Sequence, residues 1–475
     1  MVKNKLIAGV DVGSSSIKWA VYDLEDMELV RSGNVRYPGG AFEKDNVNVD
    51  MVADIYLHTL DMLDKMGVLY VGMSTMAPIL ICMNSEKIAL TGVPYNSLLG
   101  SDFLSYLNKD TYRDITLNIP NVQFFYQKLK WIKKNASNIF AATRWVVDLN
   151  GFLFTKLENS KNQPVQDINT ALEWGLLNHK TRVWEPTTVQ ELGIETRLPE
   201  LVPPEYSCKY RHMAVSIGTV DTIVSALGSI SMDSNKFFIT NGSTLCAGYV
   251  SKTPVKSNTL YNDLYFEGRY LINGCNSQYS TILDWAERNF KRNIDVNRID
   301  MNPRAITFLP YLEGERCPIF NTQIRAGFYG IDRWSTNDDM IAAIVHSMAY
   351  LSVDMIENLM RSNEGTHHFN GIIAGGGMSK VNIGSIVAAL TNLRYEITGI
   401  EPTTLGACLI AMKGNGLIDR YSVAKHHLLK IEHKINPDTS ILTHKISYDR
   451  FKRFRDSTIK ILKESDQPQP TDQSD

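Results

Sequence analysis

A turn close to the N-terminus has the residue types that bind phosphate. Asp11 ends an apolar run, and Gly13, Ser14 and Ser15 precede a second apolar run that contains Lys18. Such a turn exposes backbone N–H groups and hydroxyls, which bind anions, with Lys18 close to the same anion. Asp11 would repel a bare phosphate, but it fits if Mg²⁺ lies between them, because Mg²⁺ prefers carboxylate, water and phosphate oxygens. A surface hairpin with turn-forming serines explains these residues equally well.

A second turn of the same type lies in the middle of the chain. Gly242, Ser243 and Thr244 separate two further apolar runs. Two such turns in a duplicated chain could hold one polyphosphate from both sides. The sequence contains neither a GxxxxGK[ST] pattern nor a GxGxxG that opens a helix, so a nucleotide site here would be of another type.

Three consecutive glycines, Gly375, Gly376 and Gly377, follow an apolar strand pattern and precede a helical one. Glycine allows positive φ and a close approach of the backbone to a flat ligand. One glycine at a strand-to-helix turn would indicate packing, whereas three in a row favour a ligand. The small residues Gly406 and Ala407 indicate close helix packing, which is a structural role.

Asp221 is an acid within an apolar segment of small residues that leads into a helix. Its alternatives are a capping or first-turn aspartate favoured by the helix dipole and a catalytic base that faces a cleft between domains; the sequence alone favours the structural role. The pairs His367-His368 and His426-His427 have no acid or cysteine at metal-ligand spacing, so we interpret both as solvated surface residues.

The elements that must position these residues alternate between strands and helices. Residues 5–10 and 18–23 are expected to form a hairpin, 51–66 a helix and 68–74 a buried strand, which predicts a layered α/β domain. Further helices are expected at 123–135, 138–157, 337–360 and 457–463, and a further strand at 369–375. Residues 236–250 repeat the strand–turn–strand order of the first hairpin, which indicates a weak internal duplication.

Composition limits the class of protein. The chain has 475 residues, which predicts two or three domains, and a formal charge of −2, which gives no field for nucleic acid or an anionic membrane. No secretory signal and no apolar run long enough to span a bilayer are expected. Six cysteines lie far apart, without a CxxC pair, so we expect reduced thiols in a cytoplasmic protein.

Taken together, these segments resemble the FGGY carbohydrate kinases, which belong to the superfamily of actin, hexokinase and the heat-shock ATPases. "GVDVGSSSIKWAVYD" is similar to the family's first phosphate motif, "SIGTVDTIVSALGS" to its catalytic segment and "TNGST" to its second phosphate turn. "FLPYLEGERCPIFN" with "RAGFYGI", the most specific match, resembles its C-domain signature, and "AGGGMSK" resembles its adenosine segment. The matches run in the expected order over most of residues 5 to 450.

The resemblance implies an α/β fold of two RNase H-like, actin-like ATPase domains that flank a central cleft. It implies an N-terminal sugar-binding domain over 1–228 and a C-terminal ATP-binding domain over 229–430. A helical extension over 431–463 and a disordered tail over 464–475 complete the expected organisation.

The resemblance also implies roles for the residues named above. Asp221 would be the catalytic base, and Asp11 would organise Mg²⁺. Gly13, Ser14, Ser15 and Lys18 would bind phosphates together with Gly242, Ser243 and Thr244. Gly375, Gly376, Gly377 and Ser379 would line the adenosine site.

The segments expected to bind the sugar depart from the family pattern. Met76 and Pro78 stand where many members have Gln or His, and Asp102 is present without the arginine that usually follows the family's acid. Met76, Asp102 and Asp221 are therefore the expected substrate-binding residues of a modified site. A less polar substrate, another binding mode and a damaged site all stay open.

The function implied is transfer of the γ-phosphate of ATP to a hydroxyl of a small sugar or polyol, with ATP and Mg²⁺ as cofactors. The layout is most similar to xylulose kinases, which suggests a ketopentose; gluconate and glycerol or polyol kinases are the alternatives. A catalytically inactive sugar- or nucleotide-binding relative is the competing class, but it would be expected to have lost Asp11, Asp221 or one of the turns. No nucleic-acid or membrane partner is expected, and a homodimer stays open.

Overall fold

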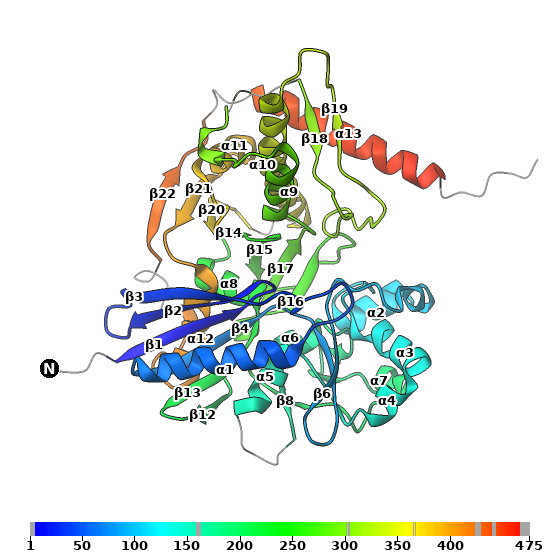
Figure 1. Cartoon of the computed structure of the whole chain (residues 1–475), viewed down its shortest axis with the longest axis vertical. Coiled ribbons are helices and arrows are strands. Elements are labelled where there is room, and N and C mark those ends of the chain that lie inside the picture. Colours follow the sequence, from blue (N-terminus) through cyan, green and yellow to red (C-terminus); the bar gives the residue numbers. More distant parts are fainter. Residues whose placement is uncertain are drawn as a thin grey trace, which may run out of the picture. The chain divides into compact units, whose positions relative to one another are not determined.

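The computed structural model describes residues 5–157, 163–300, 302, 305–363, 365, 367–422, 429–438 and 443–465. The chain divides into two compact units, each built from separated segments (Figure 1). Unit 1 contains Met1–Asp233, Val250–Ile272 and Ile400–Lys430, and unit 2 contains Ser234–Tyr249, Asn273–Gly399 and Ile431–Asp475. The domain limits expected from the sequence, with a boundary at 228, remain a prediction.

Unit 1 is organised around a mixed sheet in the order β12-β13-β4-β1-β2-β3. Its strands are β1 (Leu6–Val12), β2 (Ser16–Asp23), β3 (Leu29–Arg36), β4 (Val68–Thr75), β12 (Ser207–Tyr210) and β13 (Met213–Val220). The predicted hairpin is present, since β1 pairs antiparallel with β2, and β1, β4 and β13 run parallel to one another. The carboxyl ends of these three parallel strands therefore lie at one edge of the sheet.

Helices and smaller sheets complete unit 1. Its helices are α1 (Val49–Lys65), α2 (Lys109–Thr116), α3 (Phe125–Asn135), α4 (Ser137–Ala142), α5 (Leu149–Leu157), α6 (Ile168–Leu172), α7 (Pro186–Leu192), α8 (Asp221–Ile230) and α12 (Pro402–Gly414), with short 3₁₀ helices η1 (Ser101–Tyr106) and η2 (Phe266–Gly268). The remaining strands are β5 (Leu80–Met83), β6 (Ala89–Val93), β7 (Trp145–Val147), β8 (Val165–Asp167), β9 (Leu177–Asn178), β10 (Val183–Trp184), β11 (Glu200–Val202) and β16 (Tyr261–Leu264).

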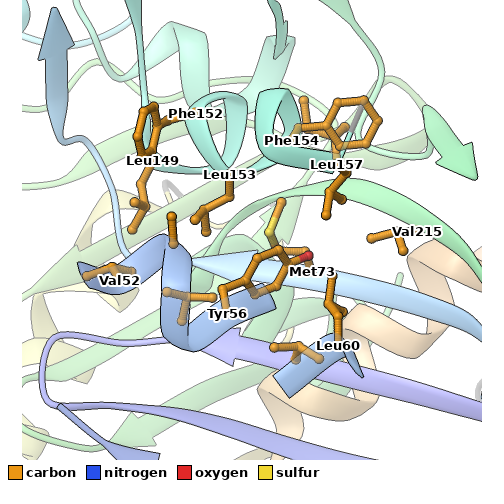
Figure 2. Packing of buried hydrophobic residues seen from close by; sticks show 14 of the residues in the cluster. Val52, Tyr56, Leu60, Met73, Leu149, Phe152, Leu153, Phe154, Leu157 and Val215 are labelled. Atoms are coloured by element: carbon orange, nitrogen blue, oxygen red, sulfur yellow. The ribbon is translucent and has the colours of Figure 1, made fainter. Parts of the chain in front are cut away.

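The main core of unit 1 lies between one face of the sheet and helices α1 and α5. Figure 2 shows Met73 of β4 surrounded by Tyr56 and Leu60 of α1 and by Leu153 of α5. All four residues are buried, so removal of apolar surface from water holds these helices on the sheet. Helix α1 begins where the Asn48 side chain accepts a hydrogen bond from the Met51 amide, which is a common way to start a helix.

Unit 2 contains a second sheet that repeats part of this plan. Its strands include the run β15-β14-β20-β21-β22 of a seven-stranded sheet, with β14 and β15 antiparallel and β14, β20 and β21 parallel. The bounds are β14 (Lys236–Asn241), β15 (Leu245–Ser251), β20 (Gly371–Gly375), β21 (Arg394–Thr398) and β22 (Ile431–Ile435). Each unit thus begins its sheet with a hairpin whose first strand pairs in parallel with a later strand, as the predicted duplication requires.

The other elements of this half of the chain are β17 (Tyr270–Cys275), α9 (Ser280–Phe290), η3 (Val296–Arg298), β18 (Thr307–Leu309), β19 (Gly327–Tyr329), α10 (Asn337–Ser362), α11 (Val381–Thr391) and α13 (Thr443–Ser465). Helix α10 is long and apolar enough to cross a membrane, contrary to the expectation that no run is. Since 89% of its most apolar window is buried within the fold, it is a core helix here.

Two expectations from the sequence are wrong. Residues 138–157 do not form one helix: α4 and α5 are separated by β7, because β7 pairs with β5 at Ile81 and Val147. Nor are all six cysteines thiols, since Cys246 and Cys275 form a disulfide. Cys82, Cys208, Cys317 and Cys408 are free. Sequence spacing could not reveal the pair, because strand packing brings the two residues together. The predicted tail after 465 lies outside the described residues.

Candidate active site

The carboxyl edge of the unit 1 sheet brings three predicted site residues together. Asp11 near the end of β1 is in register with Ser74 of β4 and, across the hairpin, with Lys18 of β2. Val220, the last residue of β13, is in register with Thr75, and Asp221 follows directly. Residues that the sequence separates by up to 210 positions therefore meet at one edge of a sheet, where ligands of such sheets commonly bind.

Asp11 is a buried acid, and its neighbours have opposing effects on its pKa. The Ser74 hydroxyl donates to its Oδ1 at 3.1 Å. Burial raises the pKa of Asp11 to about 7; Lys18 opposes this effect, whereas Asp221 and Glu401 add to it. Burial also works against the charge of Lys18, but the carboxylates of Glu401, Asp11 and Asp221 outweigh it and raise the pKa of that lysine. The Lys18 ammonium lies 3.8 Å from Glu401 Oε2.

Asp221 is the first residue of α8, and its position depends on an irregularity in β13. The pairing of β13 with β4 shifts between Ser216 and Thr219, around Gly218, whose φ is +66°. A Cβ at Gly218 would lie 1.7 Å from the Met73 carbonyl oxygen, so only glycine fits. A β-bulge re-aims the residues that follow it. As a first-turn residue Asp221 also has the favourable helix-dipole interaction that the structural alternative described.

Gly13, Ser14 and Ser15 form the predicted turn between β1 and β2. The Gly13 amide donates to the Ser16 carbonyl at 3.1 Å, and the Ser15 carbonyl accepts from the Tyr37 amide. Ser14 and Ser15 are exposed. Within the described ranges their amides donate to no protein group, so the turn presents free N–H groups and hydroxyls, as an anion-binding turn must.

The second predicted turn, Gly242 to Thr244, connects β14 and β15 in unit 2. A neighbouring segment holds it: the Tyr279 amide donates to the Ser243 carbonyl at 2.6 Å, and the Ser280 amide donates to the Gly242 carbonyl at 3.1 Å. The Leu245 amide donates to Asn276 Oδ1 at 2.7 Å. Contacts from another segment therefore hold this turn in place. Cys246, the residue after Leu245, forms the disulfide with Cys275.

The glycine run follows β20 and lies next to this turn. Gly376 has a φ of +91°, and a Cβ there would lie 2.5 Å from the Asn241 carbonyl oxygen. The Met378 amide donates to that carbonyl, and the Asn241 amide group donates to Ser379 Oγ at 3.1 Å. A Cβ at Gly377 would meet nothing within 4 Å, so the backbone there is open. Ser379 donates to the Gly375 carbonyl at 2.6 Å, which assigns it a loop-holding contact.

Of the other two residues proposed for the sugar, Met76 directly follows β4, and its amide donates to the Val12 carbonyl at 3.0 Å, whereas Asp102 lies elsewhere in unit 1. The side chain of Met76 belongs to the main hydrophobic core and is only 4% exposed. Asp102 lies in η1, where it is exposed. Neither contributes a buried polar group to the carboxyl edge of the sheet. Their roles in substrate binding remain predictions.

Several residues that hold the predicted site residues in place were not identified from the sequence. They are Ser74 and Glu401, which contact Asp11 and Lys18, and Asn276, which holds the second turn. The residue that each of them contacts lies far away in the chain, so no local sequence pattern could have indicated it. Within the described ranges there is no group of three or more His, Cys, Asp or Glu that could hold a metal ion. His426 and His427 lie outside these ranges.

Part of the chain matches the model of a known protein family. Residues 237–414 match the C-terminal domain of the FGGY family of carbohydrate kinases. This range contains the second turn, the disulfide and the glycine run. Enzymes of this family are phosphotransferases with alcohol acceptors, so the resemblance inferred from the motifs and the enzyme class that it implied are confirmed.

Curated relatives match most of the chain at low identity. A glycerol kinase of Saccharolobus islandicus (strain M.16.27) is 23% identical over 465 residues, which cover 88% of this chain and 89% of that protein. A xylulose kinase of Lactococcus lactis is 24% identical over 332 residues, 64% of this chain and 65% of that protein. The two relatives act on different acceptors, so similarity alone does not select one.

Solved structures confirm the fold. The gluconate kinase of Lactobacillus acidophilus superimposes with a TM-score of 0.84 at 19% identity and covers 96% of this chain and 98% of that chain. The Plasmodium falciparum glycerol kinase with ADP has a TM-score of 0.81 at 16% identity, with 95% and 98% covered. The expected two-domain actin-like ATPase fold is therefore confirmed.

Proposed function

Because residues 237–414 belong to the C-terminal domain family of the FGGY carbohydrate kinases, we propose that this chain transfers the γ-phosphate of ATP to a hydroxyl of a small sugar or polyol. The observation that carries the proposal is the convergence of Asp11, Lys18 and Asp221 at the carboxyl edge of the unit 1 sheet. A base, a cation and a second acid at one edge suit phosphoryl transfer, which depends mainly on alignment and charge stabilisation.

Asp221 is the proposed catalytic base. Its carboxylate would accept the proton of the attacking hydroxyl, and the bulge at Gly218 fixes the backbone that carries it. Carboxylates are ordinary general bases when they lie within hydrogen-bond reach of the hydroxyl. The first turn, Gly13 to Ser15 with Lys18, and the second turn, Gly242 to Thr244, are the proposed phosphate ligands. Gly375 to Gly377 form the proposed adenosine surface, with Ser379 holding the loop.

Mg²⁺ is the proposed metal, and Asp11 is the residue that would hold it. Among the residues that the structure describes, the Asp11 carboxylate accepts one hydrogen bond, from Ser74, although the side chain is buried. A carboxylate in this setting gains from a nearby cation, and one or two carboxylates together with phosphate oxygens are an ordinary Mg²⁺ ligand set. Bound there, the ion would neutralise charge on the phosphates of ATP.

The proposed acceptor is a ketopentose such as xylulose, with glycerol and gluconate as alternatives. An inactive relative is less well supported, since Asp11, Asp221 and both turns are retained in a geometry that presents them together within their units. A first test is ADP release with Mg-ATP and each of xylulose, glycerol and gluconate, measured against ATP hydrolysis without an acceptor. Activity with none of a broad set of ketoses, polyols and aldonates would contradict the proposal.

The decisive variant is Asp221→Asn. Loss of a general base is expected to lower kcat by about 100-fold or more, because the attacking hydroxyl then has no proton acceptor. ATP affinity, measured by calorimetry, should stay within about threefold of wild type, since the proposed nucleotide ligands are unchanged. Asp54→Asn, an exposed acid of α1, is the matched control and should keep full activity. If Asp221→Asn retained more than a tenth of the wild-type kcat, Asp221 would not be the catalytic base.

A further inference from the structure

Five polar side chains lie together in the interior of unit 1, and the proposed reaction uses none of them. All five are 0% exposed. They are Asn150 of α5, Gln166 and Asp167 of β8, Thr170 of α6 and Thr219 of β13. We refer to these five residues as the polar cluster. Buried polar side chains need partners, so the hydrogen bonds of the cluster show what it holds.

Hydrogen bonds join the polar cluster into one unit. Asn150 Nδ2 donates to Asp167 Oδ2 at 2.5 Å, and Gln166 Nε2 donates to Asn150 Oδ1 at 2.7 Å. Asp167 Oδ1 accepts from the Thr170 amide at 3.0 Å, which starts α6. The Thr170 and Thr219 hydroxyls lie 3.1 Å apart, within hydrogen-bond distance. Such a cluster favours a single arrangement, because a displaced group would lose a partner that water cannot replace.

The polar cluster contacts β13 at the irregular segment before Asp221. Across the bulge, β13 advances three residues while β4 advances two, so the regular ladder is interrupted around Gly218. Side chains from two helices contact this segment: Asn150 Nδ2 lies 3.5 Å from the Gly218 carbonyl oxygen, and the Thr170 hydroxyl contacts that of Thr219. The backbone that leads to Asp221 is therefore held by α5 and α6 as well as by the sheet.

Stability alone does not require a polar cluster at this place. Buried hydrogen-bonded groups can often be replaced by apolar groups of the same shape at little cost in stability. Apolar burial is non-directional, however, whereas hydrogen bonds fix the direction of the groups that they join. Direction matters next to a catalytic group, because a misplacement of about 1 Å can lower a rate by about 100-fold.

We propose that Thr170 and Thr219 are positioning residues, which hold the end of β13 so that Asp221 is oriented toward the hydroxyl that it deprotonates. Asn150 and Asp167 in turn hold Thr170 and the Gly218 carbonyl in place. This inference rests on the proposed function, since Asp221 is the base in that scheme. The polar cluster acts through Asp221 and takes no part in the proton transfer.

The decisive comparison is between a single and a double variant. Thr219→Val takes one partner away from the Thr170 hydroxyl, so the unfolding temperature should fall by about 4 °C. Thr170→Val together with Thr219→Val removes both hydroxyls with little change of shape, and this double variant should unfold within about 2 °C of wild type. A purely structural role predicts that kcat recovers with stability. A positioning role predicts a kcat about 10-fold below wild type in both variants, with KM for ATP within about twofold.

Two controls accompany these variants. Thr219→Ser keeps the hydroxyl and should keep kcat within about threefold of wild type. Thr59→Val changes a buried threonine of α1, whose hydroxyl donates to the Ile55 carbonyl at 2.8 Å, and it should keep the wild-type kcat. A wild-type kcat in the double variant, or an equal loss in Thr219→Ser and Thr219→Val, would overturn the inference. The activity of the wild-type chain would leave the proposed function intact in either case.

Hydrogen exchange of the segment 215–222 provides a readout that does not depend on the reaction. Loss of both hydroxyls should speed exchange of its backbone amides at least about 10-fold, whereas Thr59→Val should leave their exchange unchanged. If the wild-type chain phosphorylates no acceptor, the proposed function fails, and exchange alone decides whether the polar cluster holds the end of β13. Unchanged exchange in the double variant would then refute that as well.

Discussion

Glu315 is a buried acid in the segment that carried the most specific motif. Its Oε1 accepts from the Ser277 amide at 2.6 Å and from the Arg316 amide at 2.8 Å. Burial nevertheless raises the pKa of Glu315 to about 7, since these hydrogen bonds and the Arg316 charge offset only part of the desolvation. The motif contains the residue, but only the fold shows that its carboxyl group is out of water.

This raised pKa predicts a pH-dependent stability. The folded protein holds the Glu315 proton more tightly than the unfolded chain, whose pKa is near 4.5. The contribution of Glu315 to the free energy of unfolding should therefore fall by about 3 kcal/mol as pH rises from about 4.5 to about 7 and should be level above that range. Urea unfolding of wild type at pH 5, 6, 7 and 8 measures the slope.

Glu315→Gln isolates this contribution. A glutamine keeps an oxygen for both amides and cannot ionise, so the variant should lose the part of the slope that Glu315 contributes and gain stability relative to wild type toward pH 8. Glu313→Gln, an exposed acid two residues away, is the matched control and should keep the wild-type slope. Identical slopes in wild type and Glu315→Gln would contradict the assignment.

Helix α12 can pack where it does because the strand residues that face it are glycines, which have no side chain. Gly9 of β1 and Gly72 of β4 are paired in register. A Cβ at Gly9 would lie 1.8 Å from the Thr404 carbonyl oxygen, and one at Gly72 would lie 1.8 Å from that of Ala407. The helix thus lies directly on the sheet backbone. Gly406 also packs closely, against Val224 of α8, in agreement with the structural role expected for that small residue.

This contact predicts the effect of one added methyl group. Gly72→Ala would place its Cβ inside a backbone carbonyl, so α12 must move, and overpacking of this kind costs about 3 kcal/mol. Gly39→Ala, where a Cβ would meet nothing within 4 Å, should change the free energy of unfolding by less than about 0.5 kcal/mol. Urea unfolding of both variants tests the prediction. Equal stabilities would mean that α12 does not rest on β4 as described.

At the scale of the whole molecule, each compact unit is assembled from segments far apart in the sequence. Helix α12 belongs to unit 1 although unit 2 contains most of the residues just before it. In unit 2, the disulfide from Cys246 to Cys275 closes a span of 29 residues beside the second turn. Disulfides are rare in reducing compartments, so this pair removes the support that free thiols were expected to give to a cytoplasmic location.

The disulfide predicts a response to reductant. Closing a loop of this length limits the unfolded chain, and its loss should lower the stability of unit 2 by about 3 to 4 kcal/mol. Calorimetry of thermal unfolding with and without dithiothreitol measures the shift in the unfolding temperature. Cys246→Ser should already be destabilised and should show no further change with reductant. If dithiothreitol left the unfolding temperature of the wild-type chain unchanged, this result would contradict the disulfide.

The sequence by itself determined the alternation of strands and helices, both hairpins with their Gly- and Ser-containing turns, the glycine run and the resemblance to a family, because these depend on local periodicity, turn chemistry and the order of motifs. Only the tertiary structure decided which strands are adjacent, and hence that Ser74 binds Asp11, that Cys246 meets Cys275 and that Gly9 and Gly72 support α12. Burial, register and like-charge repulsion arise between segments hundreds of residues apart, and no local pattern in the chain encodes them separately.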